Sequence, residues 1–309
     1  MKFAIHVGFS KTGTTTLQRH LFAGHSQIEY VGKPYAEEPF KQALHHFMMA
    51  DSTLYQPKKL DLFQRIQKRM KNADSSKKVF LLSEEMMVSY TKVRDKGVVA
   101  QRIKEYLQPQ KIIITIRNQE DLLKSAYLSR GRLLLNVPQK YTQLAVSFSE
   151  WLELSYTNFQ RSYLEHANFV STIDFYSRLF GKENVCVVVL EELINDTETH
   201  INKLSQFLGI DAKEALACVG TAHEHKEITQ TILDLERLKT KFFPFHRSGL
   251  AGGILKIAGF FKKRKYKDAA AEIHLPEGWE QRLNELYAAG NQRLVDEYHL
   301  PLQKYGYPL

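Results

Sequence analysis

The sequence predicts a three-layer α/β fold in which helices flank a central parallel sheet. Short β-branched, apolar runs alternate with longer helical segments along the chain, as expected when helices cover a parallel sheet. Residues 111–116 hold four isoleucines and a threonine, which is typical of a strand buried on both faces. The 309 residues are 43% hydrophobic and 25% charged, values that allow a large core and exclude a wholly disordered, collagenous or coiled-coil chain.

Each element follows from a local pattern. Strands are expected at 3–9, 28–31, 79–82, 111–116 and 185–190. Helices are expected at 14–22, 60–70, 98–107, 119–134, 172–180, 198–208, 228–241 and 278–298. Pro109 ends one helix because the residue before proline avoids the α region. Gly181 and Gly209 each follow a helical run, as expected for helix-terminating glycines.

Composition narrows the class of protein further. Lys and Arg total 43 against 34 Asp and Glu, so the net charge is +9 and anionic ligands are favoured. Only Cys186 and Cys218 occur, which excludes a disulfide scaffold or a cysteine-built zinc site. The longest apolar run, 250–261, is broken by Lys256 and is shorter than the ~20 residues that span a bilayer. With no secretory leader evident either, we expect a cytoplasmic protein without a transmembrane segment.

The most informative segment lies between the first strand and the first helix. A helix N-terminus presents unsatisfied N–H groups and the positive end of the helix dipole, so this turn is a natural anion site. Gly13 lets the backbone approach a ligand, Lys11 adds a full charge and the threonines add hydroxyls. The candidate phosphate-binding residues are Ser10, Lys11, Thr12, Gly13, Thr14, Thr15 and Thr16. The fold is therefore expected to be P-loop-like; the alternative is a simple glycine turn with an exposed lysine.

The loop differs from that of nucleoside triphosphatases at one position. Gly8 and Gly13 have the glycine separation of G-x-x-x-x-G-K-[ST], but Thr14 stands where the lysine belongs. Triphosphatases use that lysine on the β- and γ-phosphates and the next hydroxyl on magnesium. Its absence argues against phosphoryl transfer from ATP. A magnesium-dependent P-loop kinase or nucleotidase remains the alternative enzyme class.

Two motifs together resemble a known family. Residues 6–18, HVGFSKTGTTTLQ, resemble the 5′-phosphosulfate-binding loop of sulfotransferases that use 3′-phosphoadenosine 5′-phosphosulfate (PAPS), with Ser10 replacing the usual proline. Arg117 ends the 112–116 strand and Ser125 follows eight residues later, which resembles the family's 3′-phosphate motif. Arginine suits this task because its planar fork binds phosphate through two donors. The alternative for Arg117 is a surface salt bridge to Asp121. Weaker likenesses lie at 185–209 and 286–308.

The resemblance implies a bacterial, carbohydrate-sulfotransferase-like enzyme with PAPS as co-substrate and no metal. It further implies one sulfotransferase domain over 1–309, whose C-terminal helical portion, about 226–309, completes the site. Lys11 is expected at the bridging oxygen, where negative charge grows as the sulfuryl group leaves. Leu190 stands where the family's adenine-contacting tyrosine would align.

A base is needed because an acceptor hydroxyl or amine loses a proton as it attacks. Ser83, Glu84 and Glu85 follow the strand at 79–82, which resembles the place where this superfamily carries a catalytic histidine or glutamate. Glu84 is the predicted base because it lies nearer the strand end. Two alternatives remain: both glutamates begin the next helix, where acids favour the dipole, or the run is a magnesium-binding Walker B strand.

The acceptor site is only weakly marked, and we expect a carbohydrate or small-molecule acceptor. Arg130 and Arg132 suit an acidic acceptor. The aromatic side chains Trp151, Tyr156 and Tyr163 either stack on a sugar or form core.

Two further segments leave alternatives open. The histidines of residues 223–225, HEH, form only a weak metal motif. The basic block 262–267 either closes over the nucleotide, is solvated, or contacts a membrane surface together with 250–261. After the sulfotransferase and the kinase or nucleotidase, the third functional hypothesis is a non-catalytic protein that binds polyanions through its net charge. Because the phosphate motifs are present, no nucleic-acid partner is expected.

Overall fold

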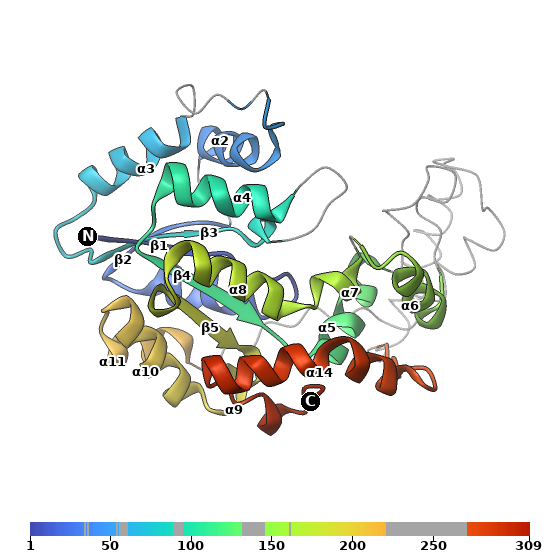
Figure 1. Ribbon diagram of the computed structural model, residues 1–309. Coiled ribbons are helices and arrows are strands. Elements are labelled where there is room, and N and C mark those ends of the chain that lie inside the picture. The colour runs from blue at the N-terminus through green and yellow to red at the C-terminus, as the bar shows by residue number, and fades with distance from the viewer. Residues whose placement is uncertain are drawn as a thin grey trace, which may run out of the picture. The chain divides into compact units, whose positions relative to one another are not determined.

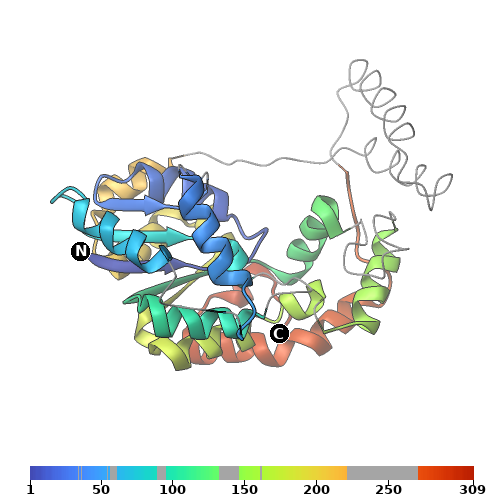
Figure 2. The ribbon, with the colours of Figure 1, turned by 90° about the horizontal axis from the view of Figure 1, so that it is seen from above.

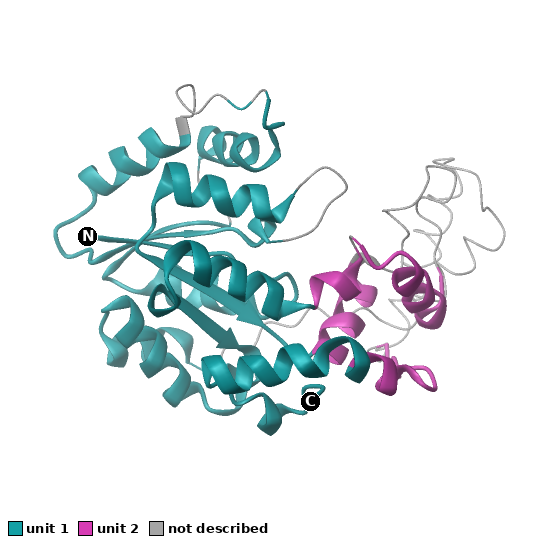
Figure 3. Cartoon of the chain, viewed as in Figure 1, with its two compact units in different colours: residues 1–118, 168–224, 284–309 teal, residues 119–167, 225–283 magenta. Residues whose placement is uncertain are grey.

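The computed structural model describes two compact units. The described residues are 1–33, 35, 37–53, 55, 61–88, 95–131, 146–160, 162–220 and 271–309. The first unit comprises residues 1–118, 168–224 and 284–309, and the second comprises 119–167 and 225–283 (Figure 3). The first unit contains the sheet and most of the residues singled out by the sequence.

The first unit is built on a five-stranded parallel sheet with the order β2-β3-β1-β4-β5 (Figure 1). Its strands are β1 (Lys2–His6), β2 (Ile28–Val31), β3 (Val79–Ser83), β4 (Lys111–Ile116) and β5 (Val185–Val189). The central strand is β1, in which Ile5 lies opposite Leu82 of β3 and Ile112 of β4. The described strands therefore confirm the predicted parallel sheet.

Helices cover both faces of this sheet. One layer contains α1 (Thr14–Thr16), the π-helix η1 (Leu17–Phe22), α10 (Thr197–Leu208) and α11 (Ala212–Val219). The other contains α4 (Lys96–Arg102) and α8 (Phe169–Phe180). Figure 2 shows the strands between these two layers. Ala4, Leu81, Ile113 and Val188 are fully buried in the core on the side of η1, α10 and α11, because alternate residues of a strand face the same side. The three-layer α/β prediction is confirmed.

The remaining elements complete the two units. The first unit also holds α2 (Glu38–Met49), α3 (Asp61–Asn72), η3 (Glu85–Met87), η4 (Ile103–Leu107), η7 (Lys182–Asn184), α9 (Leu190–Asn195) and η8 (Leu302–Tyr305). The second holds α5 (Gln119–Ala126), η5 (Tyr127–Gly131), α6 (Phe148–Thr157) and α7 (Tyr163–His166). Helix α14 (Trp279–Tyr298) contributes to both. Among the described helices, none is long and apolar enough to cross a membrane.

The aromatic residues of the second unit form its core. The Trp151 ring packs against Tyr127, Phe148 and Tyr163, with centroid separations of 5.7–5.9 Å, and Trp151 is 5% exposed. Of the two alternatives for these aromatic side chains, sugar stacking or core packing, Trp151 therefore fits core packing. Tyr156 differs, because it is 44% exposed and contacts the edge of Trp279.

Several boundaries differ from the prediction. The helix expected at 14–22 divides into α1 and the π-helix η1, and that at 98–107 into α4 and η4. Helices α2 and α11 were not predicted. The helix expected at 228–241 and the basic block at 262–267 lie outside the described residues.

Candidate active site

Three candidate segments meet at one edge of the sheet. The carboxyl ends of β3, β1 and β4 are neighbours, with His6 paired to Ser83 on one side and to Ile113 on the other. Glu84 follows β3, the glycine- and threonine-rich loop follows β1, and Arg117 follows β4. Crevices at the carboxyl edge of a parallel sheet are where such folds bind ligands. The loop is therefore flanked by the predicted base and the predicted arginine.

The loop path needs its glycines. The Phe9 N–H donates to the Thr115 carbonyl over 3.2 Å, which holds the chain close to β4. A Cβ atom on Gly8 would lie 2.0 Å from Thr115 Oγ1, so any larger residue there would clash. Gly13 has φ +72°, and Lys11 has φ +69° although it is not a glycine. A lysine in this sparsely populated region stores strain of about 1–3 kcal/mol, as functional loops often do.

The threonine hydroxyls divide into inward-facing and outward-facing groups. Thr12 is 1% exposed, and its Oγ1 donates to the Phe9 carbonyl (2.5 Å) and contacts Thr115 Oγ1 (2.6 Å). Thr14 Oγ1 donates to Glu85 Oε1 over 2.6 Å. Thr15 is exposed and Thr16 is half-buried, like Ser10. The hydroxyls of Thr12 and Thr14 thus fix the loop, whereas those of Ser10, Thr15 and Thr16 are the ones open to a ligand.

Two positive charges lie together at this edge. Arg117 Nη1 donates to the Lys11 carbonyl over 3.4 Å. Removal from water and the nearby Arg117 guanidinium lower the pKa of Lys11, while the Glu85 carboxylate partly opposes this change. Adjacent cations repel one another, and a bound dianion would relieve that repulsion. Lys11 and Arg117, which the sequence analysis assigns to the two phosphates, are therefore in direct contact.

A neutral histidine lies beneath the loop. His6 is fully buried, with its Nδ1 2.8 Å from Ser83 Oγ, and the Gln18 amide donates to the same hydroxyl over 2.9 Å. Burial lowers the pKa of His6 to about 3. His6 therefore adds no charge to the site and supports the loop by packing, as its place on β1 suggested.

Glu84 and Glu85 have different surroundings. Glu84 is 3% exposed and begins the 3-10 helix η3, with its Oε1 accepting from the Met86 N–H over 2.8 Å. The Lys33 ammonium lies 3.3 Å from the same oxygen, and the Tyr35 hydroxyl donates to Oε2. Glu85 is half-buried and accepts from Thr14 of the loop. The helix-capping role weighed for these acids is thus present for Glu84, whose role as base stays a prediction.

The sequence did not reveal Lys33 and Tyr35. Both lie in the segment after β2, where no motif or periodicity marked a functional side chain. The one available signal was their position after the carboxyl end of β2, which pairs with β3 and so brings them near Glu84.

The end of β4 is held by residues distant in the chain. The Asn118 N–H donates to Glu191 Oε1 over 2.9 Å, and the Tyr307 hydroxyl donates to Glu191 Oε2 over 2.9 Å. The Asn118 amide also donates to the carbonyls of Tyr305 (3.2 Å) and Gly306 (2.7 Å). The C-terminal turn therefore fixes the backbone beside Arg117.

Other sequence candidates fall elsewhere. Ser125 is half-buried on α5 in the second unit. Leu190 packs against the loop, since a Cβ on Gly13 would lie 2.3 Å from Leu190 Cδ1. Arg132 and residues 223–225 lie outside the described residues, as does the side chain of Arg130.

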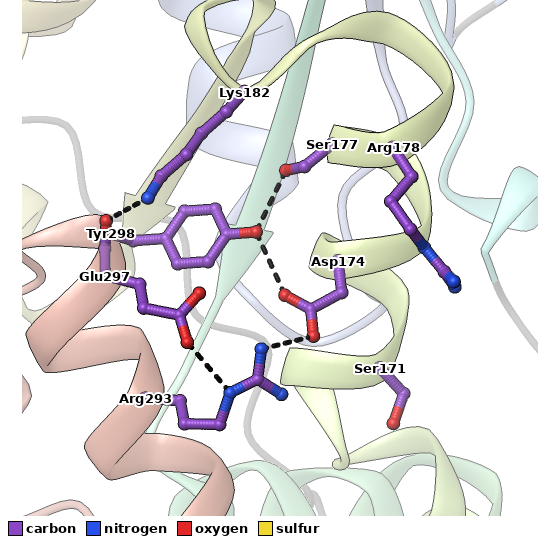
Figure 4. A pocket seen from close by; sticks show the side chains of 8 residues that line it. All are labelled: Ser171, Asp174, Ser177, Arg178, Lys182, Arg293, Glu297 and Tyr298. Carbon is purple, nitrogen blue, oxygen red and sulfur yellow. Dashed lines mark hydrogen bonds and ion pairs between the residues drawn. The ribbon is translucent and has the colours of Figure 1, made fainter.

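A separate cleft of about 620 Å³ lies between α8 and α14 (Figure 4). Three of its charged side chains pair with one another: Arg293 bonds Asp174 at 2.9 Å and Glu297 at 3.0 Å. The Tyr298 hydroxyl points toward Asp174 and Ser177, at 3.0 and 3.1 Å. None of the candidate phosphate-binding residues lines this cleft. Within the described part of the chain, no three histidine, cysteine or acidic side chains are grouped to hold a metal ion.

The fold and this edge define a class of protein. A central parallel strand that enters a glycine- and threonine-rich loop, with cationic side chains at adjoining strand ends, characterises a P-loop-like phosphate-binding protein. The chain belongs to the sulfotransferase domain family, which it matches over residues 4–293. It is accordingly a sulfotransferase, which confirms the predicted enzyme class.

Two sulfotransferases and one sulfotransferase domain are among the solved structures that resemble this chain. The sulfotransferase from Alicyclobacillus acidocaldarius is 21% identical, covering 79% of this chain and 92% of its own, with a TM-score of 0.49. A mouse sulfotransferase complexed with PAP is 16% identical, with coverage of 96% and 89% and a TM-score of 0.47. The sulfotransferase domain of the Synechococcus PCC 7002 olefin synthase is 14% identical, with coverage of 89% and 96% and a TM-score of 0.43. No curated protein matches the chain significantly. The family assignment rests on the match over residues 4–293.

Proposed function

We propose that this sulfotransferase moves a sulfuryl group from PAPS to a hydroxyl or amine of a carbohydrate or small-molecule acceptor. The observation that carries the proposal is the contact between Arg117 and the Lys11 loop at the end of the central strand. PAPS carries phosphates at two positions of its ribose, so a protein that binds it needs two cationic sites within reach of one nucleotide. The loop and Arg117 fit that requirement.

Each candidate residue then has a task in the transfer. Backbone N–H groups of residues 10–16 and the Lys11 ammonium stabilise the 5′-phosphate oxygen from which the sulfuryl group departs. Arg117 binds the 3′-phosphate. A sulfuryl group carries less negative charge than a phosphoryl group, so one lysine and several amides can balance the charge that develops.

Glu84 supplies the base in this proposal. It lies at the carboxyl end of β3, beside the strand that enters the loop. As the acceptor oxygen or nitrogen attacks sulfur, its proton passes toward the Glu84 carboxylate, which makes the acceptor a better nucleophile. An acidic acceptor, such as a uronic or sulfated sugar, would be favoured by the net charge of +9.

The test is transfer from ³⁵S-labelled PAPS to a panel of neutral and acidic saccharides and small alcohols and amines. Lys11→Ala is expected to lower transfer at least 10²-fold, the usual effect of removing one group that stabilises transition-state charge. Lys78→Ala removes an exposed lysine just before β3 and serves as the matched control. The same assay in EDTA tests the kinase or nucleotidase alternative. Undiminished transfer by Lys11→Ala, or turnover with ATP and magnesium alone, would overturn the proposal.

A further inference from the structure

The proposed base is closed off from solvent in the structure. The Glu84 side chain is 4% exposed, whereas that of Lys33 beside it is 41% exposed. Oε1 of Glu84 accepts from the Met86 N–H and lies 3.3 Å from Lys33 Nζ, while Oε2 accepts from the Tyr35 hydroxyl. Tyr35 is only half-buried. Of this hydrogen-bonded pair, Tyr35 is therefore the more exposed side chain.

We propose that Tyr35 is a catalytic residue that relays the acceptor proton to Glu84. The proposal rests on the proposed function, because it adds a second group to the base of the same reaction. A phenol hydroxyl can donate one hydrogen bond and accept another at the same time. Tyr35 already donates to Glu84 Oε2, so its oxygen lone pairs remain to accept a hydrogen bond from the acceptor.

The step balances in atoms and charge. The acceptor O–H or N–H bond breaks, and that proton goes to the Tyr35 oxygen. The phenol proton of Tyr35 moves at the same time to Glu84 Oε2, which converts the carboxylate into a carboxylic acid. The acceptor atom forms a bond to sulfur as the bond between sulfur and the 5′-phosphate oxygen breaks. The products are the sulfated acceptor and 3′,5′-adenosine bisphosphate.

The surroundings keep Tyr35 protonated between turnovers. Burial, then the charge of Glu84 and the hydrogen bond to it, raise the pKa of Tyr35, and Tyr30 and Glu85 act in the same direction. A free tyrosinate is therefore disfavoured, and the two proton movements must be coupled. The Lys33 ammonium is the positive charge beside this group. Its nitrogen lies 3.3 Å from Glu84 Oε1.

The Tyr35–Glu84 contact can be tested without any reaction. In protein labelled with ¹³Cζ-tyrosine, the Tyr35 resonance is the one absent from Tyr35→Phe. Glu84→Gln removes the charge that accepts the Tyr35 hydrogen bond, so this resonance is expected to move, whereas that of exposed Tyr156 is not. A Tyr35 resonance insensitive to Glu84→Gln would overturn the relay.

The relay itself is tested by measuring turnover as release of the bisphosphate from PAPS. Water serves as the acceptor if no better acceptor is found. Tyr35→Phe removes one oxygen and is expected to lower kcat about 10²-fold, with KM for PAPS and affinity for the bisphosphate within twofold of wild type. Because both groups serve one proton path, Tyr35→Phe/Glu84→Gln should be no slower than the slower single variant. Tyr298→Phe is the control, since the Tyr298 hydroxyl contacts Asp174 and Ser177 in the separate cleft between α8 and α14 rather than Glu84.

The outcomes separate the two proposals. Wild-type protein that binds the bisphosphate but neither transfers nor hydrolyses PAPS would contradict the proposed function. An active wild type with an equally active Tyr35→Phe would overturn the relay alone. So would single-variant losses that multiply in the double variant, since independent contributions do that.

Discussion

Replacement of Gly13 by alanine tests whether the phosphate loop depends on one backbone position. Gly13 has φ +72°, and a Cβ there would lie 2.3 Å from Leu190 Cδ1. An L-residue in the left-handed region costs about 1–2 kcal/mol, and forcing a methyl group into a packed site costs about 1–3 kcal/mol. The expected loss in the free energy of unfolding is therefore about 2–5 kcal/mol.

Gly278 offers a matched control. It has φ +77°, but a Cβ there would meet nothing within 4 Å. Gly278→Ala should therefore cost only the backbone part, about 1–2 kcal/mol. The difference between the two variants measures the contact with Leu190, and in a Leu190→Ala background Gly13→Ala should cost only the backbone part.

Urea denaturation followed by circular dichroism gives these free energies, and calorimetry with 3′,5′-adenosine bisphosphate gives the effect on the loop. Gly13→Ala is expected to weaken nucleotide binding at least tenfold, whereas Gly278→Ala leaves it unchanged. Equal costs for the two alanines, or full nucleotide affinity in Gly13→Ala, would refute the close packing of Leu190 on the loop.

Two other predictions concern the elements that support the site. The His200 hydrogen bond, then Lys203, hold the pKa of Glu192 at about 2 against an ordinary 4.5. The resulting stabilisation, about 3 kcal/mol, is present above pH 4.5 and is lost as the pH falls toward 2. Glu192→Gln should therefore be less stable at pH 7 and show a flatter decline in acid; parallel urea-denaturation curves for both proteins would contradict this. Tyr307→Phe removes the hydroxyl that donates to Glu191 and should lower the free energy of unfolding by about 1.5–3 kcal/mol. The same variant should also bind the bisphosphate several-fold more weakly in calorimetry. If Tyr307→Phe kept both the stability and the affinity of wild type, the C-terminal turn would not hold the end of β4.

The strands were the most predictable part of the fold. The β-branched run 111–116 matches β4 residue for residue, and 28–31 matches β2, because burial on both faces leaves a continuous apolar signal. Helix interruptions were not predictable: nothing in the pattern at 14–22 distinguishes an α-helix from the π-helix η1. Helix α2 was missed even though Pro39 lies in its first turn, because Glu37 at its N-cap is not a typical capping residue and makes no capping hydrogen bond.

The candidate site was predictable where chemistry follows a strand end. Lys11, Glu84 and Arg117 were predicted from the family resemblance and from their places after apolar runs, and the parallel order of β3, β1 and β4 brings all three to one edge. The partners of Glu84 could not be found this way, because Lys33 and Tyr35 reach it only through the pairing of β2 with β3. The inward turn of the Thr12 hydroxyl was equally hidden, because it depends on the contact with Thr115.

The most direct test of the central claim is a calorimetric comparison of 3′,5′-adenosine bisphosphate with 5′-AMP on wild type and Arg117→Ala. If the loop binds the 5′-phosphate and Arg117 the 3′-phosphate, wild type should bind one bisphosphate per chain at least tenfold more tightly than 5′-AMP. Arg117→Ala should remove most of that preference while retaining affinity for 5′-AMP. An equal affinity of wild type for the two nucleotides, or a preference unchanged by Arg117→Ala, would contradict the account.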